Sequence, residues 1–271
     1  MIAAVRAELL KQGKRPTMGM LALLALGSVV VFRYGVPYTS YLSGVMGVQV
    51  LQGLQPMAVV PKLGAAVALE LSVVAVLAGA LAAGDEHEWG TVKTELTQRA
   101  SRWRVFGGQV LGFAVMAAIL VVTLLAAALA SASVIALIEG TPHTRPPVSE
   151  LGTGVTAWWL IIMMWVACGL LLGTLLRLSG LAAGLGLVWM LGIENTIREL
   201  RAQIDFLATV YEALPGANAT GLAASLGPVP GSSPPWAGPP PSGSHLTAVV
   251  IIYLVAFLVI AGMVFRTRDV K

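Results

Sequence analysis

Charge is scarce in this chain of 271 residues. Only 11% of the residues are Asp, Glu, Lys or Arg, whereas soluble domains average about 25%. Hydrophobic residues make up 57% of the chain, and the mean hydropathy is +0.83. The low charge argues against an ordinary water-soluble enzyme, and the apolar excess excludes an intrinsically disordered chain. One membrane span takes about 20 apolar residues, so roughly five to seven spans would leave too little sequence for a separate globular domain.

Cysteine and histidine are almost absent as well. The single cysteine, Cys168, cannot form an intrachain disulfide, and no Cys/His cluster has the spacing of a metal site. The sequence contains no Walker A loop and no visible pairing of a nucleophile with a base. We therefore expect a protein that is not an enzyme and that binds no cofactor or metal itself. If ATP drives it, another chain must hydrolyse the ATP.

Long apolar runs are what the sequence does have. They predict an all-α, polytopic membrane protein, a single domain over residues 1–271 with six transmembrane helices. The expected spans are about residues 17–36, 63–84, 107–131, 153–176, 178–193 and 245–265. The third lies in an apolar run of residues 105–138, so its helix should tilt or project beyond the bilayer. Residues 3–15 have one apolar and one charged face, which predicts an amphipathic helix on the membrane surface.

Two stretches are predicted to lie outside the membrane. Residues 37–62 contain Pro56 and Pro61, which should end any helix there, so this stretch is expected to be a surface segment. Residues 194–244 are expected to form an outer helix and loop. The helix is predicted by an apolar stripe with alternating spacings of four and three, formed by Ile193, Ile197, Leu200, Ile204, Leu207, Tyr211 and Leu214. This helix should lie on the bilayer or pack on its neighbours, with pairing to a second copy as the alternative. Residues 215–244 hold eight of the 15 prolines, which predicts an extended loop.

Pairs of glycines spaced four apart predict close helix packing within the bundle. They are Gly108 with Gly112, Gly169 with Gly173, and Gly180 with Gly184. Arg177 separates two apolar runs and predicts a tight turn between the fourth and fifth spans.

The basic residues are unevenly placed. Residues 1–16, 85–106, 177 and 266–271 contain 12 of the 17 Lys and Arg. Under the positive-inside rule these segments belong to the cytoplasmic side, so both termini should lie in the cytoplasm and the chain should be a multi-pass protein of the cell membrane. The net charge of +4 then reflects membrane topology, and we expect membrane lipid rather than nucleic acid as a partner.

The most informative segment is the predicted cytoplasmic loop of residues 85–106. Glu86 could accept hydrogen bonds from the N–H groups of Gly90 and Thr91, Gly90 permits a tight turn, and Thr91 could cap a following helix. The arginines that follow offer charge-assisted contacts to an acidic groove on a partner. The residues singled out are Glu86, Gly90, Thr91, Arg99, Ser101 and Arg102. An ordinary solvated loop with positive-inside charges is the alternative.

This loop resembles the cytoplasmic coupling loop of type-2 ABC transporter permeases, the membrane subunits of ABC exporters. The chain's ending, Phe265-Arg-Thr-Arg-Asp269, is similar to that family's C-terminus, and the six-span layout also agrees. The chain departs from the family pattern at Ala100 and Gln109. The resemblance implies a pair of permease subunits bound to two cytoplasmic ABC ATPase subunits, with ATP and Mg²⁺ on the ATPases. It also implies export of a hydrophobic or amphipathic substrate such as a drug, peptide or lipid.

Glu70 is the one acid well inside a predicted span. It lies seven residues, or roughly 10 Å, from the outer end of a span that begins at residue 63. An ionised acid there is costly, so Glu70 should face protein or water. It could bind a cation or substrate in a pathway, or simply pair with Arg33 or a nearby hydroxyl. Two other functions therefore stay open: an ion-coupled secondary transporter that uses Glu70, and a membrane-embedded immunity or binding protein without transport.

Overall fold

The computed structural model describes residues 2–45, 47–88, 101–141, 144–230 and 242–267, and these residues are helical with short turns between the helices. Within them, six helices are long and apolar enough to cross a membrane, which confirms the predicted class and the number of candidate spans. These helices are Pro16–Leu42, Pro56–Asp85, Arg102–Ile138, Val148–Leu176, Ser179–Leu200 and Gly243–Thr267. A short helix α1, Ile2–Gly13, precedes them.

The first span is longer than predicted because it continues through Pro37. It consists of α2 (Pro16–Gly27), a π-helical segment η1 (Ser28–Gly35) and α3 (Val36–Leu42). The Val36 N–H bonds to the Val31 carbonyl, five residues back. Pro37, which has no N–H to donate, follows this wider turn at the start of α3, where its ring is tolerated. Residues 37–42 therefore continue the helix of the first candidate span, which the prediction had ended at residue 36.

The second span also starts earlier than residue 63. A 3₁₀ turn at Pro56–Ala58 leads into α5 (Val59–Ala66), a second π segment η3 (Val67–Leu71) and α6 (Ser72–Glu88). Pro61 is the third residue of α5, in the first turn, where a missing N–H costs no helical hydrogen bond. The prediction that Pro61 ends helical structure was therefore wrong.

The centre of the bundle is the crossing of α6 with α9 (Val148–Leu176). At this crossing Gly79 of α6 faces Gly169 of α9, and a Cβ atom added to either would overlap backbone atoms of the other helix. The α9 helix is the most buried candidate span, since 67% of the residues in its most apolar stretch are buried. The indole rings of Trp158 and Trp165 are fully enclosed. Small residues thus let two helices meet backbone to backbone, and large side chains of α9 are enclosed elsewhere along the same helix.

The three glycine pairs behave differently. Gly108 and Gly112 of α8 (Arg102–Ile138) pack against α1, since Cβ atoms added there would meet Ala4 and Glu8. Gly169 and Gly173 receive α6. Gly180 and Gly184 of α10 (Ser179–Leu187) face open space, with no described atom within 4 Å of an added Cβ. Two of the pairs therefore pack within the bundle as predicted, whereas the third does not.

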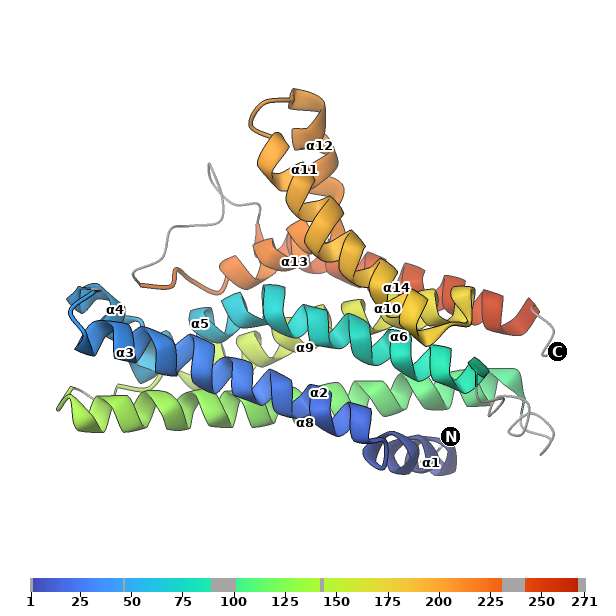
Figure 1. The fold of residues 1–271 in the computed structure, drawn as a ribbon, viewed down its shortest axis with the longest axis horizontal. Helices are drawn as coiled ribbons and strands as arrows, with labels where there is room; N and C mark the ends of the chain where they lie inside the picture. Colours follow the sequence, from blue (N-terminus) through green and yellow to red (C-terminus); the bar gives the residue numbers. More distant parts are fainter. Residues whose placement is uncertain (1, 46, 89–100, 142–143, 231–241, 268–271) are drawn as a thin grey trace.

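The predicted outer helix of residues 193–214 is two helices. After α10 and a π segment η4 (Val188–Ile193) comes α11 (Glu194–Leu200), then a turn and α12 (Asp205–Ala213). The hairpin projects from the bundle at the top of Figure 1. Ile197 of α11 packs with Tyr211 and Leu214, so part of the apolar stripe folds back on itself, whereas Ile193, Leu200 and Ile204 stay exposed. A single continuous helix could not make this contact.

The predicted loop of residues 215–244 begins as a helix. α13 (Pro215–Ala224) has proline as its first residue and lies with most of its side chains buried. Just before α13, the carbonyl of Ala213, the last residue of α12, accepts a hydrogen bond from the Tyr253 hydroxyl of α14 (Gly243–Thr267). The extended-loop prediction was therefore wrong for residues 215–224.

One end of the bundle gathers the described chain ends. Figure 1 shows α1, the end of α6, the starts of α8 and α10, and the end of α14 together at the right. Arg102 ties two of these by donating from Nη1 to the Arg266 carbonyl at 2.7 Å. Arg177, the predicted turn residue, ends α9 in the left-handed conformation with φ of 58°. The described parts of the segments that the charge count assigned to one side of the membrane lie at one end of the molecule.

We predict that Gly169→Ala lowers the thermal stability of the detergent-solubilised protein, whereas Gly184→Ala does not. Both changes replace a helical glycine and gain the same roughly 1 kcal/mol of helix propensity. Only the first forces a methyl group against the α6 backbone, at a cost of about 1–3 kcal/mol. Equal melting temperatures for the two variants would contradict the α6–α9 packing described here.

Candidate functional site

Glu70 pairs with Arg33 where the first two spans meet. The Arg33 Nη2 atom lies 2.9 Å from Glu70 Oε1, and it also donates to the Ala65 carbonyl at 3.1 Å. The two side chains are 25% and 30% exposed, so the pair is half-buried. This is the structural alternative to a substrate or ion role for Glu70 that the sequence left open.

The pair leaves hydrogen-bonding capacity unused. Glu70 Oε2 and Arg33 Nε are both buried, and neither has a hydrogen-bond partner among the described residues. Unpaired polar atoms are expensive at hydrocarbon depth, so such atoms mark a place where water or a polar ligand can bind.

Two further polar side chains adjoin the pair. Lys62 is buried, donates from Nζ to the Gly53 carbonyl at 3.0 Å, and lies 5.3 Å from the centre of the Tyr34 ring. The Tyr34 hydroxyl is buried and lacks a described partner. We call Arg33, Tyr34, Lys62 and Glu70 the polar cluster. It carries two cations and one carboxylate, so its net charge is positive.

A second acid was missed because it was expected to lie just outside the fifth span. Glu194 begins α11 and is buried, with its Oε1 accepting from Trp189 Nε1 at 2.9 Å and from the Gly216 backbone N–H at 3.3 Å. Gly216 is the second residue of α13, so the carboxylate sits at a helix N-terminus, where the helix dipole favours negative charge. An added Cβ at Gly216 would overlap the carboxylate, which explains why glycine is needed there.

Glu194 borders a small, partly open cavity of about 40 Å³. Leu69, the neighbour of Glu70, lines this cavity together with Tyr211 of α12 and Thr220 of α13. Burial raises the pKa of the Tyr211 hydroxyl above its usual value, partly offset by Arg201, whose guanidinium lies 4.3 Å from the ring. The cavity thus connects the second span to the outer hairpin.

Three of the charged residues inside the candidate spans lie at π-helical turns. Within the described residues, Arg33 lies in η1, Glu70 lies in η3, and Glu194 directly follows η4. Each lies about 15 to 17 residues along its helix from the end that carries the chain termini, which is roughly 22–26 Å at 1.5 Å per residue. Wide turns of this kind often mark functional positions in helices.

The residues predicted to couple to an ATPase are only partly described. Gly90, Thr91 and Arg99 lie outside the described residues. Glu86 belongs to the last turns of α6, which ends at Glu88, so the loop is shorter than the predicted residues 85–106. Ser101 caps α8 by accepting the Arg104 backbone N–H at 3.3 Å. Among the described residues, no group of three His, Cys, Asp or Glu could hold a metal ion.

Comparison with known proteins gives one family match. A family model described as a protein of unknown function, DUF2705, matches residues 20–271. No curated protein matches the chain.

We predict strong coupling between Arg33 and Glu70 in a double-mutant cycle. Arg33→Met or Glu70→Leu alone should lower the free energy of unfolding by on the order of 1–3 kcal/mol, because each leaves an unpaired charge. The double variant should recover much of that loss, as measured by thermal unfolding in detergent. The exposed pair Arg198–Glu199 is the control and should show no coupling. Additive losses for the first pair would contradict a stabilising ion pair.

We also predict that Glu194→Ala loosens α13. Without the carboxylate, the Gly216 N–H loses its acceptor, so amide hydrogen exchange over residues 217–224 should become faster. Glu199→Ala, on the exposed face of the same helix, is the matched control and should leave exchange unchanged. Unchanged protection in both variants would show that Glu194 does not hold the helix.

Proposed function

This chain belongs to the DUF2705 family, whose function is unknown, and we propose that it is the membrane subunit of an ATP-driven ABC exporter. In this proposal two copies, or this chain and a related one, pair in the cell membrane and bind two cytoplasmic ABC ATPase subunits. The chain itself hydrolyses nothing, and ATP and Mg²⁺ bind to the partner. The substrate is hydrophobic or amphipathic.

The observation that carries the proposal is the charged end of the bundle. The α1 helix, the end of α6, the start of α8 and the end of α14 lie together there, and Arg6, Lys14, Arg104 and Arg266 are exposed on it. A transporter driven by a separate ATPase needs a stiff, charged surface on its cytoplasmic side to receive force. The hydrogen bond from Arg102 to Arg266 joins the start of α8 to the end of α14, so a displacement of this end of the bundle would be transmitted to both helices.

The polar cluster favours transport with an external energy source over ion coupling through Glu70. The charge of a carboxylate paired with a guanidinium at 2.9 Å is already balanced, so the pair offers little net attraction to a sodium ion. The net positive charge of the cluster instead favours contact with a polar or acidic group of a passing substrate. The alternative of a binding or immunity protein without transport differs in predicting no ATPase partner.

We predict that Arg104→Glu weakens copurification with a Walker-type ATPase encoded beside this chain, and that it lowers substrate-stimulated ATP hydrolysis in proteoliposomes. The charge reversal places a carboxylate where the proposed contact needs a cation. Arg145→Glu is the matched control, because Arg145 is exposed between α8 and α9 at the opposite end of the bundle.

Glu86→Ala and Arg102→Glu test the predicted loop residues in the same assay. Loss of ATPase binding in these variants but not in Arg145→Glu would support the coupling loop. Undiminished assembly and ATPase activity in all the variants would refute it. ATP-independent, ion-dependent uptake that Glu70→Gln abolishes would favour the secondary transporter instead.

A further inference from the structure

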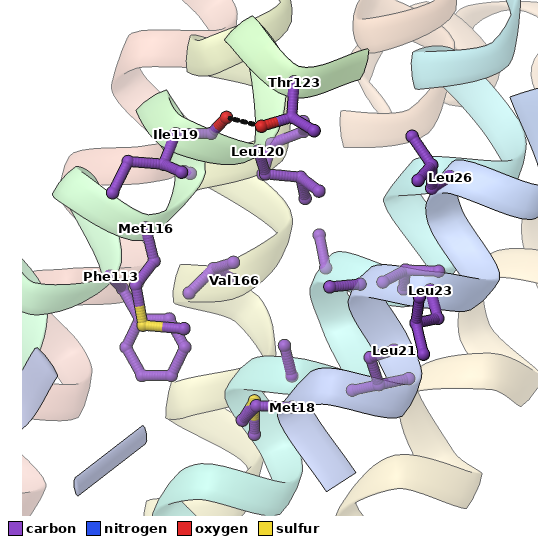
Figure 2. Close-up of a pocket in the computed structure, with 16 residues that line it drawn as sticks. Met18, Leu21, Leu23, Leu26, Phe113, Met116, Ile119, Leu120, Thr123 and Val166 are labelled. Atoms are coloured by element: carbon purple, nitrogen blue, oxygen red, sulfur yellow. Dashed lines mark hydrogen bonds between the residues drawn. The ribbon is translucent and has the colours of Figure 1, made fainter. Parts of the chain in front are cut away.

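An apolar cavity opens on the side of the bundle between the first and third spans. It has a volume of about 310 Å³ and is lined by α2, α6, α8 and α9. In Figure 2, side chains of α2 and α8 face one another across it. The only lining side chain with a polar group is Thr123, and its hydroxyl already donates to the Ile119 carbonyl at 2.8 Å. The cavity therefore has nothing with which to bind a polar ligand.

The cavity has a buried floor and an exposed mouth. Phe113, Ala117 and Val166 form part of the floor and are at most 4% exposed. Leu23 and Ile119 lie at the mouth and are 69% and 60% exposed. Because α2 and α8 belong to candidate spans, this mouth opens at hydrocarbon depth. The occupant must therefore be an apolar group that arrives from the bilayer.

A cationic surface lies at the α1 end of the cavity. Met18, which lines the cavity, lies in the first turn of α2, and the exposed Lys14 lies four residues before it, in the turn between α1 and α2. The α1 helix itself packs across α8 at Gly108 and Gly112, next to the lining residue Phe113. The site is thus apolar along its length and positive at the end where a lipid headgroup would lie.

We propose that this cavity binds one acyl chain of an anionic phospholipid from the leaflet on the α1 side, with the phosphate beside Lys14. An acyl chain that arrives from the bilayer matches the apolar lining, in which the one hydroxyl among the described lining residues is already hydrogen-bonded. The proposal rests on the membrane placement of the proposed function, but not on ATP or export.

The probe is a phosphatidylglycerol whose acyl chain carries a photoreactive diazirine, mixed into phosphatidylcholine vesicles that contain the full-length protein. After illumination, peptide mapping should place the adducts on residues 18–26 and 113–123. Ala22→Trp fills the mouth of the cavity and should lower this labelling several-fold. Ala118→Trp is the matched control, since Ala118 is exposed on α8 and does not line the cavity. Thr123→Trp provides a second block if Ala22→Trp lowers the yield of folded protein.

The headgroup is tested with a phosphatidylcholine probe that carries the same acyl chain. Lys14→Glu should lower labelling by the anionic probe about fivefold, the effect of roughly one basic residue on an anionic headgroup, and should leave the neutral probe unaffected. Labelling spread evenly over the exposed faces of the spans, or labelling that neither tryptophan variant reduces, would overturn the proposal. Equal labelling by both probes would overturn the headgroup assignment. A failure to bind an ATPase alters none of these results, so the two proposals fail separately.

Discussion

The backbone contact of α6 with α9 is the constraint on which the bundle depends. In a bilayer, apolar side chains gain nothing by leaving lipid for protein, so helices associate through close packing and hydrogen bonds. Gly79 and Gly169 provide that closeness, and Trp158 of the same α9 helix packs against Gly64 of α5. The other spans pack around this pair, with α14 and α10 against it and α2 beside α6.

The helical class and the number of candidate spans were predictable because length and hydropathy decide both. What failed were the predictions that depend on tertiary contacts. Pro61 was expected to end a helix but occupies a first turn, and the stripe from Ile193 to Leu214 was expected to be one helix but folds in two. Periodicity identifies the apolar face of a segment, but it does not say whether that face packs on a neighbour or on itself.

The sequence identified Glu70 and Arg33 as charged residues inside the spans, but it did not identify all the buried charges or their contacts. The sequence singled out Glu70 and named Arg33 as a partner, because an acid at that depth needs a counter-charge. It missed Glu194, whose partners come from residues 189 and 216 and meet only once α13 is buried. A signal was nevertheless present: an acid beside an apolar run, in a chain with few acids. The predicted coupling residues could be placed only in part, since Gly90, Thr91 and Arg99 lie outside the described residues.

The π-helical turns have an evolutionary consequence. A π turn holds one residue more than an α turn, so everything beyond it is rotated by about 100° relative to an uninterrupted helix. Deleting one residue within Ser28–Gly35, Val67–Leu71 or Val188–Ile193 would move the charge there to another face of its span. Point substitutions cannot produce that rotation. Substitution of a charged residue would therefore leave the rest of its span in register, whereas a single-residue gap in the π turn would not.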